Sequence, residues 1–214
     1  MQREARPLKP PPPLPISCNG ADCGNNLHCF RRTKKLISPT PKGTCLYCGT
    51  SLVNWDRVHC RDLGDVTHTM TSLNFEFIRH HFWAHVVLDP HAVNYARRKG
   101  RIGMVAAMEH RIRQSVGPGR PFHDGGQTPL EGSHDPRHYA QHATASCCRK
   151  CIEEWHGIPQ GKPLTTEQIT YLRDLAMIYI DKQLPDLSNL GEKVAPIRDS
   201  RASTTVALQN YGKH

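Results

Sequence analysis

The stretch "HATASCCRKCIEEWHGIP", residues 142–159, decides the fold, because it combines a helical pattern with three cysteines and two histidines. Its pattern predicts one helix from Tyr139 to about Trp155, which ends at the glycine and proline that follow. Thiolates and imidazoles are the side chains that zinc prefers. The stretch therefore predicts a helical, metal-stabilised domain.

A second metal site is expected on this helix. Cys148 and Cys151 are three residues apart and share a helix face, as do His81 and His85, four residues apart within a helix predicted over 74–88. Two such helices packed together predict a Cys₂His₂ site. The alternative ligands are Cys147, His142 and His156. Cysteines are also common as small buried hydrophobes, and that interpretation stays open.

The first metal site is predicted nearer the N-terminus. "CNGADC" and "CLYC" provide two cysteine pairs, and four thiolates suit a tetrahedral zinc ion in the manner of a zinc ribbon. The predicted ligands are Cys18, Cys23, Cys45 and Cys48. Cys29 competes for one of these positions, and an iron–sulfur cluster is the alternative cofactor.

The fold expected is mainly α, with a small N-terminal zinc-ribbon-like β or knuckle region, hence α+β and metal-stabilised. Residues 1–16 form a disordered proline-rich leader, and residues 17–185 a single zinc-containing domain. Within it, 17–60 is the ribbon-like part and 70–185 the helical part. Residues 186–214 are expected to be a flexible tail.

Capping signals locate further helices. Asp89 and Pro90 are suited to a helix start, and Gly100 to its end. A second helix is predicted over 101–117. Thr165 has capping-box spacing to Gln168, and the helix that it begins should stop before a proline at 185.

The chain of 214 residues carries a net charge of +9, which favours polyanionic partners such as nucleic acid. The basic stretches lie between the cysteine pairs and at the end of the helix that is predicted to start at Asp89. The candidate phosphate contacts are Arg31, Arg32, Lys34, Lys35, Arg97, Arg98, Lys99 and Arg101.

Nine cysteines, an odd number, favour metal binding in a reducing compartment over a complete set of disulfides. The sequence shows no secretory signal and no apolar run of membrane-spanning length, so a soluble, cytoplasmic protein without a membrane partner is expected. The leader "PLKPPPPLP" is a candidate ligand for a protein partner.

Two stretches, "CNGADCGNNLHCFR…GTCLYCG" and "HATASCCRKCIEEWHGIP", resemble an uncharacterised bacterial and phage family of domains of unknown function. The resemblance covers roughly residues 17–185. It implies one coherent domain that includes both cysteine clusters, and it implies no activity.

Three functions are compatible with these patterns. The first is a zinc-stabilised nucleic-acid-binding protein of unknown specificity. The second is a metal-dependent hydrolase, most simply a nuclease, that uses the Cys/His second site, with Glu153, Glu154 or Asp124 as the base. The third is a zinc-scaffolded adaptor for protein partners. Whether the protein is an enzyme does not follow from the sequence.

Overall fold

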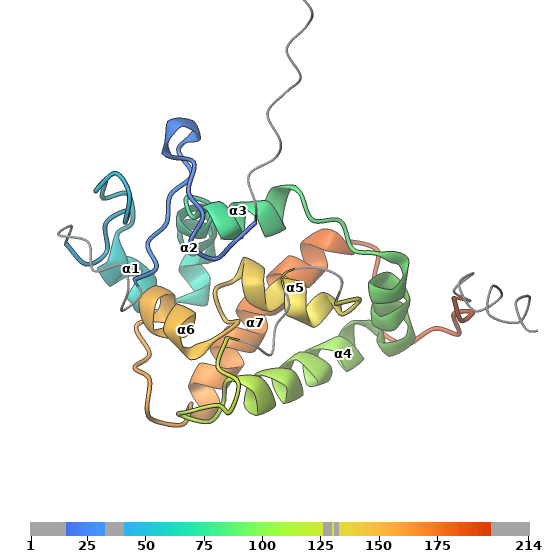
Figure 1. Cartoon of the computed structure of the whole chain (residues 1–214). Helices are drawn as coiled ribbons and strands as arrows, with labels where there is room; N and C mark the ends of the chain where they lie inside the picture. Colours follow the sequence, from blue (N-terminus) through green and yellow to red (C-terminus); the bar gives the residue numbers. More distant parts are fainter. Residues whose placement is uncertain (1–15, 33–40, 126–129, 131–132, 198–214) are drawn as a thin grey trace, which may run out of the picture.

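The computed structural model describes residues 16–32, 41–125, 130 and 133–197, and these residues are mainly helical (Figure 1). The predicted α character is therefore confirmed. None of the described helices is both long and apolar enough to cross a membrane. The helices are α1 (Trp55–His59), α2 (Val66–Leu73), α3 (Phe77–Ala84), α4 (Pro90–Ser115), α5 (Pro136–Ala143), α6 (Arg149–His156) and α7 (Thr166–Gln183), with 3-10 turns η1 (Cys23–Asn25) and η2 (Leu63–Asp65).

The described residues of the N-terminal region, 16–32 and 41–60, form loops and short helical turns. Among its described residues, pairing of extended chain is limited to two isolated bridges, Asp22 with Leu27 and His28 with Glu76. The β-hairpin of a zinc ribbon is therefore not shown. The second bridge links this region to the chain just before α3.

The core of the helical body lies between α4, α5 and α7, and α3 packs on α5 (Figure 1). Met104, Met108 and Ile112 recur every four residues along α4 and are fully buried. Leu172 and Ile180 are equally buried on α7. This regular apolar spacing is why these segments form amphipathic helices and pack together.

The break predicted at Gly100 is present as a kink within α4. Gly100 has φ 65° and ψ 170°, a conformation that glycine adopts readily. The next two amides then lack helical partners, and Arg101 donates its backbone N–H to the carbonyl oxygen of Ser188 at 2.8 Å. A Cβ at position 100 would lie 2.3 Å from the backbone of Leu190. Part of the predicted flexible tail is thus packed on α4, while residues 198–214 lie outside the described residues.

The prediction of a single helix over residues 139–155 is wrong. The structure has α5 and α6 in its place, separated by residues 144–148, with Ala145 at φ 54°. Hydroxyl groups interrupt the helix: Thr144 Oγ1 donates to the carbonyl of Ala140 at 2.8 Å and lies 3.2 Å from Ser146 Oγ. Consequently Cys147 and Cys148 lie in the turn before α6, where Cys148 is the N-cap.

Candidate metal centres

The first candidate centre joins four side chains from two segments of the chain, residues 23–28 and residues 45–48. Cys23, His28, Cys45 and Cys48 each offer one ligand atom, and these atoms all lie within 4.8 Å of one another. The turn that carries Cys45 closes with a hydrogen bond from the Gly49 amide to the Cys45 carbonyl at 2.9 Å. This chain reversal brings both sulfurs of the CxxC pair to one side.

The distances within this centre fit one tetrahedral ion. A Zn–S bond of about 2.3 Å places two sulfurs of a tetrahedron ~3.8 Å apart, and a sulfur and a nitrogen ~3.6 Å apart. The Sγ atoms of Cys23 and Cys45 are 3.7 Å apart, and Cys48 Sγ lies 3.4 Å from His28 Nδ1. A disulfide would need about 2.05 Å. The centre therefore has the size of a single zinc site.

Backbone groups prepare one of these sulfurs for a cation. Burial raises the pKa of Cys45, but hydrogen bonds from the backbone of Cys29, Cys48 and Tyr47 outweigh burial and lower it to about 6. Cys23 lacks such donors, and burial together with its neighbouring thiols raises its pKa to about 12. Cys45 is therefore the thiol that ionises most readily here.

The histidine of this centre is held by its other nitrogen. His28 Nε2 lies 3.0 Å from Asn26 Oδ1, which leaves Nδ1 facing Cys48. The backbone of His28 exchanges hydrogen bonds with Phe75 and Phe77 at 2.7 and 2.8 Å. These contacts fix the position of the ring before any metal binds.

Three of the four predicted ligands meet in this group, and His28 occupies the place in which the sequence suggested Cys18. The spacing CxxxxH in "CGNNLH" is a signal that could have identified His28. Cys18 lies outside the group and packs against the helical core. The sulfur of Cys29 is buried and approaches the carbonyls of Cys18 and Arg31 at 3.9 and 4.0 Å.

The second candidate centre consists of Cys147, Cys148 and Cys151, whose sulfurs also lie within 4.8 Å of one another. All three are at most 3% exposed. Cys148 Sγ accepts the backbone N–H of Cys151 at 3.5 Å as the cap of α6. The centre is therefore closed to solvent, unlike a hydrolytic site, which needs an open position for water and substrate.

A buried arginine touches this second centre. Arg79 on α3 donates to Cys151 Sγ at 3.1 Å, to Glu76 at 2.9 Å and to the carbonyl of His142 at 2.6 Å. Glu76 also accepts the indole N–H of Trp155 at 2.8 Å. Burial acts to lower the pKa of Arg79, but its charge interactions with Cys151 and Glu76 outweigh burial and raise it, so the guanidinium stays charged.

The predicted histidine ligands lie elsewhere among the described residues. His81 and His85 contact each other, with ring centroids 6.1 Å apart, and His142 stacks on Phe82 at 5.0 Å. His156 is fully buried, with Nε2 2.9 Å from the Thr144 carbonyl and Nδ1 3.3 Å from the Tyr171 hydroxyl. The geometry brings Cys148 and Cys151 together with Cys147, and with none of these histidines.

The predicted phosphate-binding residues are only partly available. Arg97 pairs with Glu192 at 3.0 Å and Arg101 with Asp181 at 2.8 Å. Arg31 is half-buried, and although burial acts to lower its pKa, charge interactions with Cys151 and Cys148 outweigh burial and raise it. Of the remaining five, Arg98 and Lys99 are exposed on α4, Lys34 and Lys35 lie outside the described residues, and Arg32 is half-buried.

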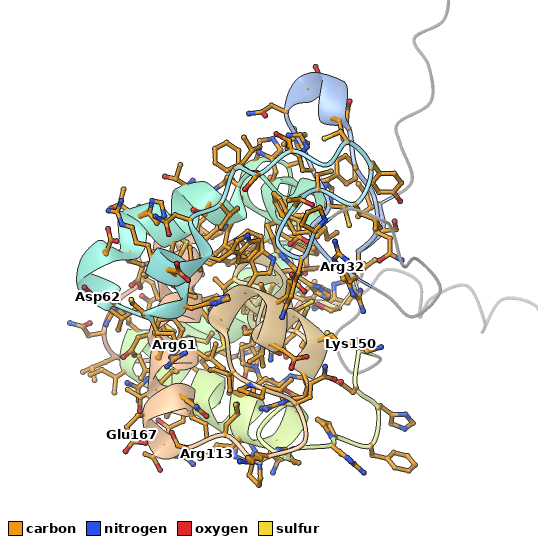
Figure 2. All side chains as sticks on the ribbon, turned by 90° about the vertical axis from the view of Figure 1, so that its left-hand side faces the viewer. Arg32, Arg61, Asp62, Arg113, Lys150 and Glu167 are labelled. Atoms are coloured by element: carbon orange, nitrogen blue, oxygen red, sulfur yellow. The ribbon has the colours of Figure 1, made fainter. Side chains whose placement is uncertain are left out.

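Arg32 lies near the first centre, and its guanidinium donates to the Pro41 carbonyl. Figure 2 labels Arg32 and Lys150 on the same face of the molecule, the face that also carries Arg61. The positive charges of Lys42 and Arg32 act on Glu154, whose pKa burial raises to about 6. This face therefore mixes cations with at least one acidic group.

Residues 68–181 match the model of a family described as a domain of unknown function (DUF4186). The match begins within α2, ends near the end of α7, and contains the second cysteine group. The first group lies before the matched residues. No solved structure matches the chain.

Proposed function

Because the chain belongs to the DUF4186 family, a domain of unknown function, its role has to be argued from its own residues, and we propose a zinc-stabilised nucleic-acid-binding protein. The observation that carries the proposal is the tetrahedral spacing of Cys23, His28, Cys45 and Cys48. In this proposal the loops of residues 16–60 act as a zinc knuckle, the counterpart of the ribbon expected from the sequence.

The proposed ion is structural. Three thiolates and one imidazole complete a tetrahedron, so no position is left for substrate or for a reactive water. An iron–sulfur cluster spreads its four protein ligands over two or four irons, so ligands on different irons would lie farther apart than the 4.8 Å within which all four ligand atoms meet here. The spacing therefore favours one ion over a cluster.

Nucleic acid is the proposed partner because of charge. The net charge of +9 favours polyanions through counterion release. Arg98 and Lys99 on α4 are exposed and next to each other, and Lys150 is exposed at the start of α6. Since acidic side chains hold Arg97 and Arg101, the contacts are assigned to Arg98, Lys99 and Lys150 first.

All nine cysteines are present as thiols, with no disulfide between them. Thiols persist in reducing compartments, and zinc thiolate sites are common there. A cytoplasmic location is therefore part of the proposal.

Elemental analysis of the purified chain tests the zinc part. The proposal predicts bound zinc, and it predicts that His28→Ala and Cys45→Ser each remove one ion per chain. Cys60→Ser is the matched control, because Cys60 is exposed and belongs to neither group. Zinc content that is the same in all four proteins would overturn the assignment of this site.

Fluorescence anisotropy with labelled single- and double-stranded DNA and RNA tests the partner. Three phosphate contacts predict an affinity that falls more than about 10-fold between 50 and 200 mM salt. The double change Arg98→Glu with Lys99→Glu should weaken binding, whereas Arg113→Gln, in which a paired arginine of the same helix is changed, should not. Absence of binding at low salt, or equal effects of both variants, would refute the proposal that nucleic acid is the partner.

A further inference from the structure

We propose that Cys147, Cys148 and Cys151 bind a second zinc ion, and that Cys18 is its fourth ligand. The first two sulfurs come from the turn after α5 and the third from the first turn of α6. This site is separate from the first centre and does not depend on it. It would tie the beginning of the described chain to the helical body.

The three sulfurs already have the arrangement that one ion needs. Each lies within 4.8 Å of the others, against the ~3.8 Å edge of a zinc–thiolate tetrahedron. Two come from adjacent residues in a non-helical turn, and the third follows after one helical turn. A small contraction therefore brings all three to bonding distance of a shared ion.

A buried cation beside these sulfurs distinguishes the group from ordinary core cysteines. Arg79 is 1% exposed and donates to Cys151 Sγ at 3.1 Å and toward Cys147 Sγ at 3.7 Å. Glu76 pairs with Arg79 at 2.9 Å, and the sulfurs of Cys151 and Cys147 accept further N–H groups of the same guanidinium. Zinc with three or four thiolates has a net charge of −1 or −2, so a zinc–thiolate group would accept these hydrogen bonds more strongly than neutral thiols do.

Cys18 is the candidate that fits the fourth position. Charge interactions with cysteines of the three-cysteine group raise the pKa of Arg31 and that of Arg79. Cys18 raises the pKa of both arginines as well. Its side chain packs against the core of the helical body. The turn that carries Cys18 lies against α3, the helix of Arg79, because a Cβ on Gly20 would lie 2.8 Å from the ring of Phe77.

The other possible ligands nearby have different contacts. Cys29 donates toward two backbone carbonyls, so its sulfur acts as a thiol. His156 has both ring nitrogens within hydrogen-bond distance of oxygens, and His142 stacks face to face on Phe82. Because Cys29, His156 and His142 make these other contacts, Cys18 is the ligand through which a closed four-sulfur site can form.

The consequence is that two ions hold one short segment. Cys18 would bind the second ion and Cys23, five residues later, the first. Each of the four thiols of the second site would release its proton to solvent on binding the cation. The N-terminal region would then be fixed to the helical body by a metal bond as well as by side-chain packing.

Cadmium-113 NMR of the full wild-type chain tests the inference without any substitution. Cadmium replaces zinc, and its chemical shift separates four-sulfur sites from sites with three sulfurs and one nitrogen. The expected result is two resonances, one of each kind. A spectrum without a four-sulfur resonance overturns the inference, while loss of the three-sulfur resonance alone would instead refute the proposed first site.

Substitutions then assign the ligands. Cys148→Ser and Cys151→Ser should each lower the metal content by one ion per chain, and Cys18→Ser should weaken the second ion at least 10-fold in competition with a chelator. Cys18→His should restore part of this loss, because imidazole is also a zinc ligand. Cys60→Ser is the control. A Cys18→Ser protein that retains the wild-type affinity and four-sulfur resonance would exclude Cys18.

Discussion

Residues 16–60 and residues 66–183 bury apolar side chains to very different extents. In the N-terminal region Phe30, Val53 and Val58 are the large apolar side chains in the buried cluster around the first centre, and Trp155 of α6 completes that cluster. The helical body buries a core contributed by five of its helices. Apolar burial stabilises the helical body, whereas the proposal assigns the stability of the N-terminal region to cross-links through metal ions.

Loss of the first ion should have the largest effect. Structural zinc contributes on the order of 10 kcal/mol, more than a short loop region gains by packing. Cys45→Ser should therefore unfold residues 16–60 while α4 and α7 stay folded. Trp55, whose indole donates to the Gly43 carbonyl at 2.7 Å, reports the loss by fluorescence, and far-UV circular dichroism reports the helices.

Unchanged Trp55 fluorescence in Cys45→Ser would contradict the proposed dependence of the N-terminal region on metal. Unfolding of the helices together with the loops would contradict the proposed independence of the helical body. Cys60→Ser, which changes an exposed cysteine of the same region, should behave as wild type.

Arg79 lies where the two regions meet, and its removal should have the next largest effect. Arg79→Met leaves Glu76 buried without its partner, which costs about 3–5 kcal/mol. The measurement is the free energy of unfolding from urea denaturation. Arg57→Met removes an exposed pair with Asp65 and should leave that free energy unchanged. Equal effects of the two substitutions would show that the buried pair has no special role.

Lowering the pH should reduce the stability of the helical body, because His156 is buried in its neutral form. Burial lowers the pKa of this histidine to about 3, against about 6.5 when unfolded, so below pH 6.5 the unfolded state binds the extra proton. Between pH 6.5 and 5 the free energy of unfolding should fall by about 2 kcal/mol on this account. His156→Gln should remove that part of the pH dependence, as measured by urea titrations at each pH. An unchanged slope would contradict it.

The smallest effect is expected at the start of α7. Thr165 Oγ1 accepts the Gln168 amide at 3.3 Å in a capping box, and Thr165→Ala should cost about 1 kcal/mol. Thr166→Ala, one residue into the helix, is the control. The thermal midpoint checks both, and a larger shift for Thr166→Ala would contradict the capping role.

Local signals in the sequence located the starts of α4 and α7 correctly. Asp89 with Pro90 begins α4, Gly100 breaks it, and Thr165 begins α7, because each signal acts through its own backbone. The division between α5 and α6 was missed, since the hydrogen bonds of Thr144 and Ser146 compete with the helix only in the folded chain.

The candidate centres were predictable to the extent that their ligands are close in sequence. Cys45 with Cys48, and Cys148 with Cys151, were identified by spacing. His28 was missed, although its CxxxxH spacing from Cys23 is a usable signal, because only its pairing with the chain before α3 makes it the ligand in place of Cys18.

Amide hydrogen exchange of the zinc-loaded and the zinc-stripped chain tests most directly whether metal holds the N-terminal region. We predict that stripping removes protection at Cys45, Leu46 and Gly49, whose amides are hydrogen-bonded around the first centre, while α4 and α7 remain protected. Protection at these three amides that survives complete removal of zinc would contradict the account.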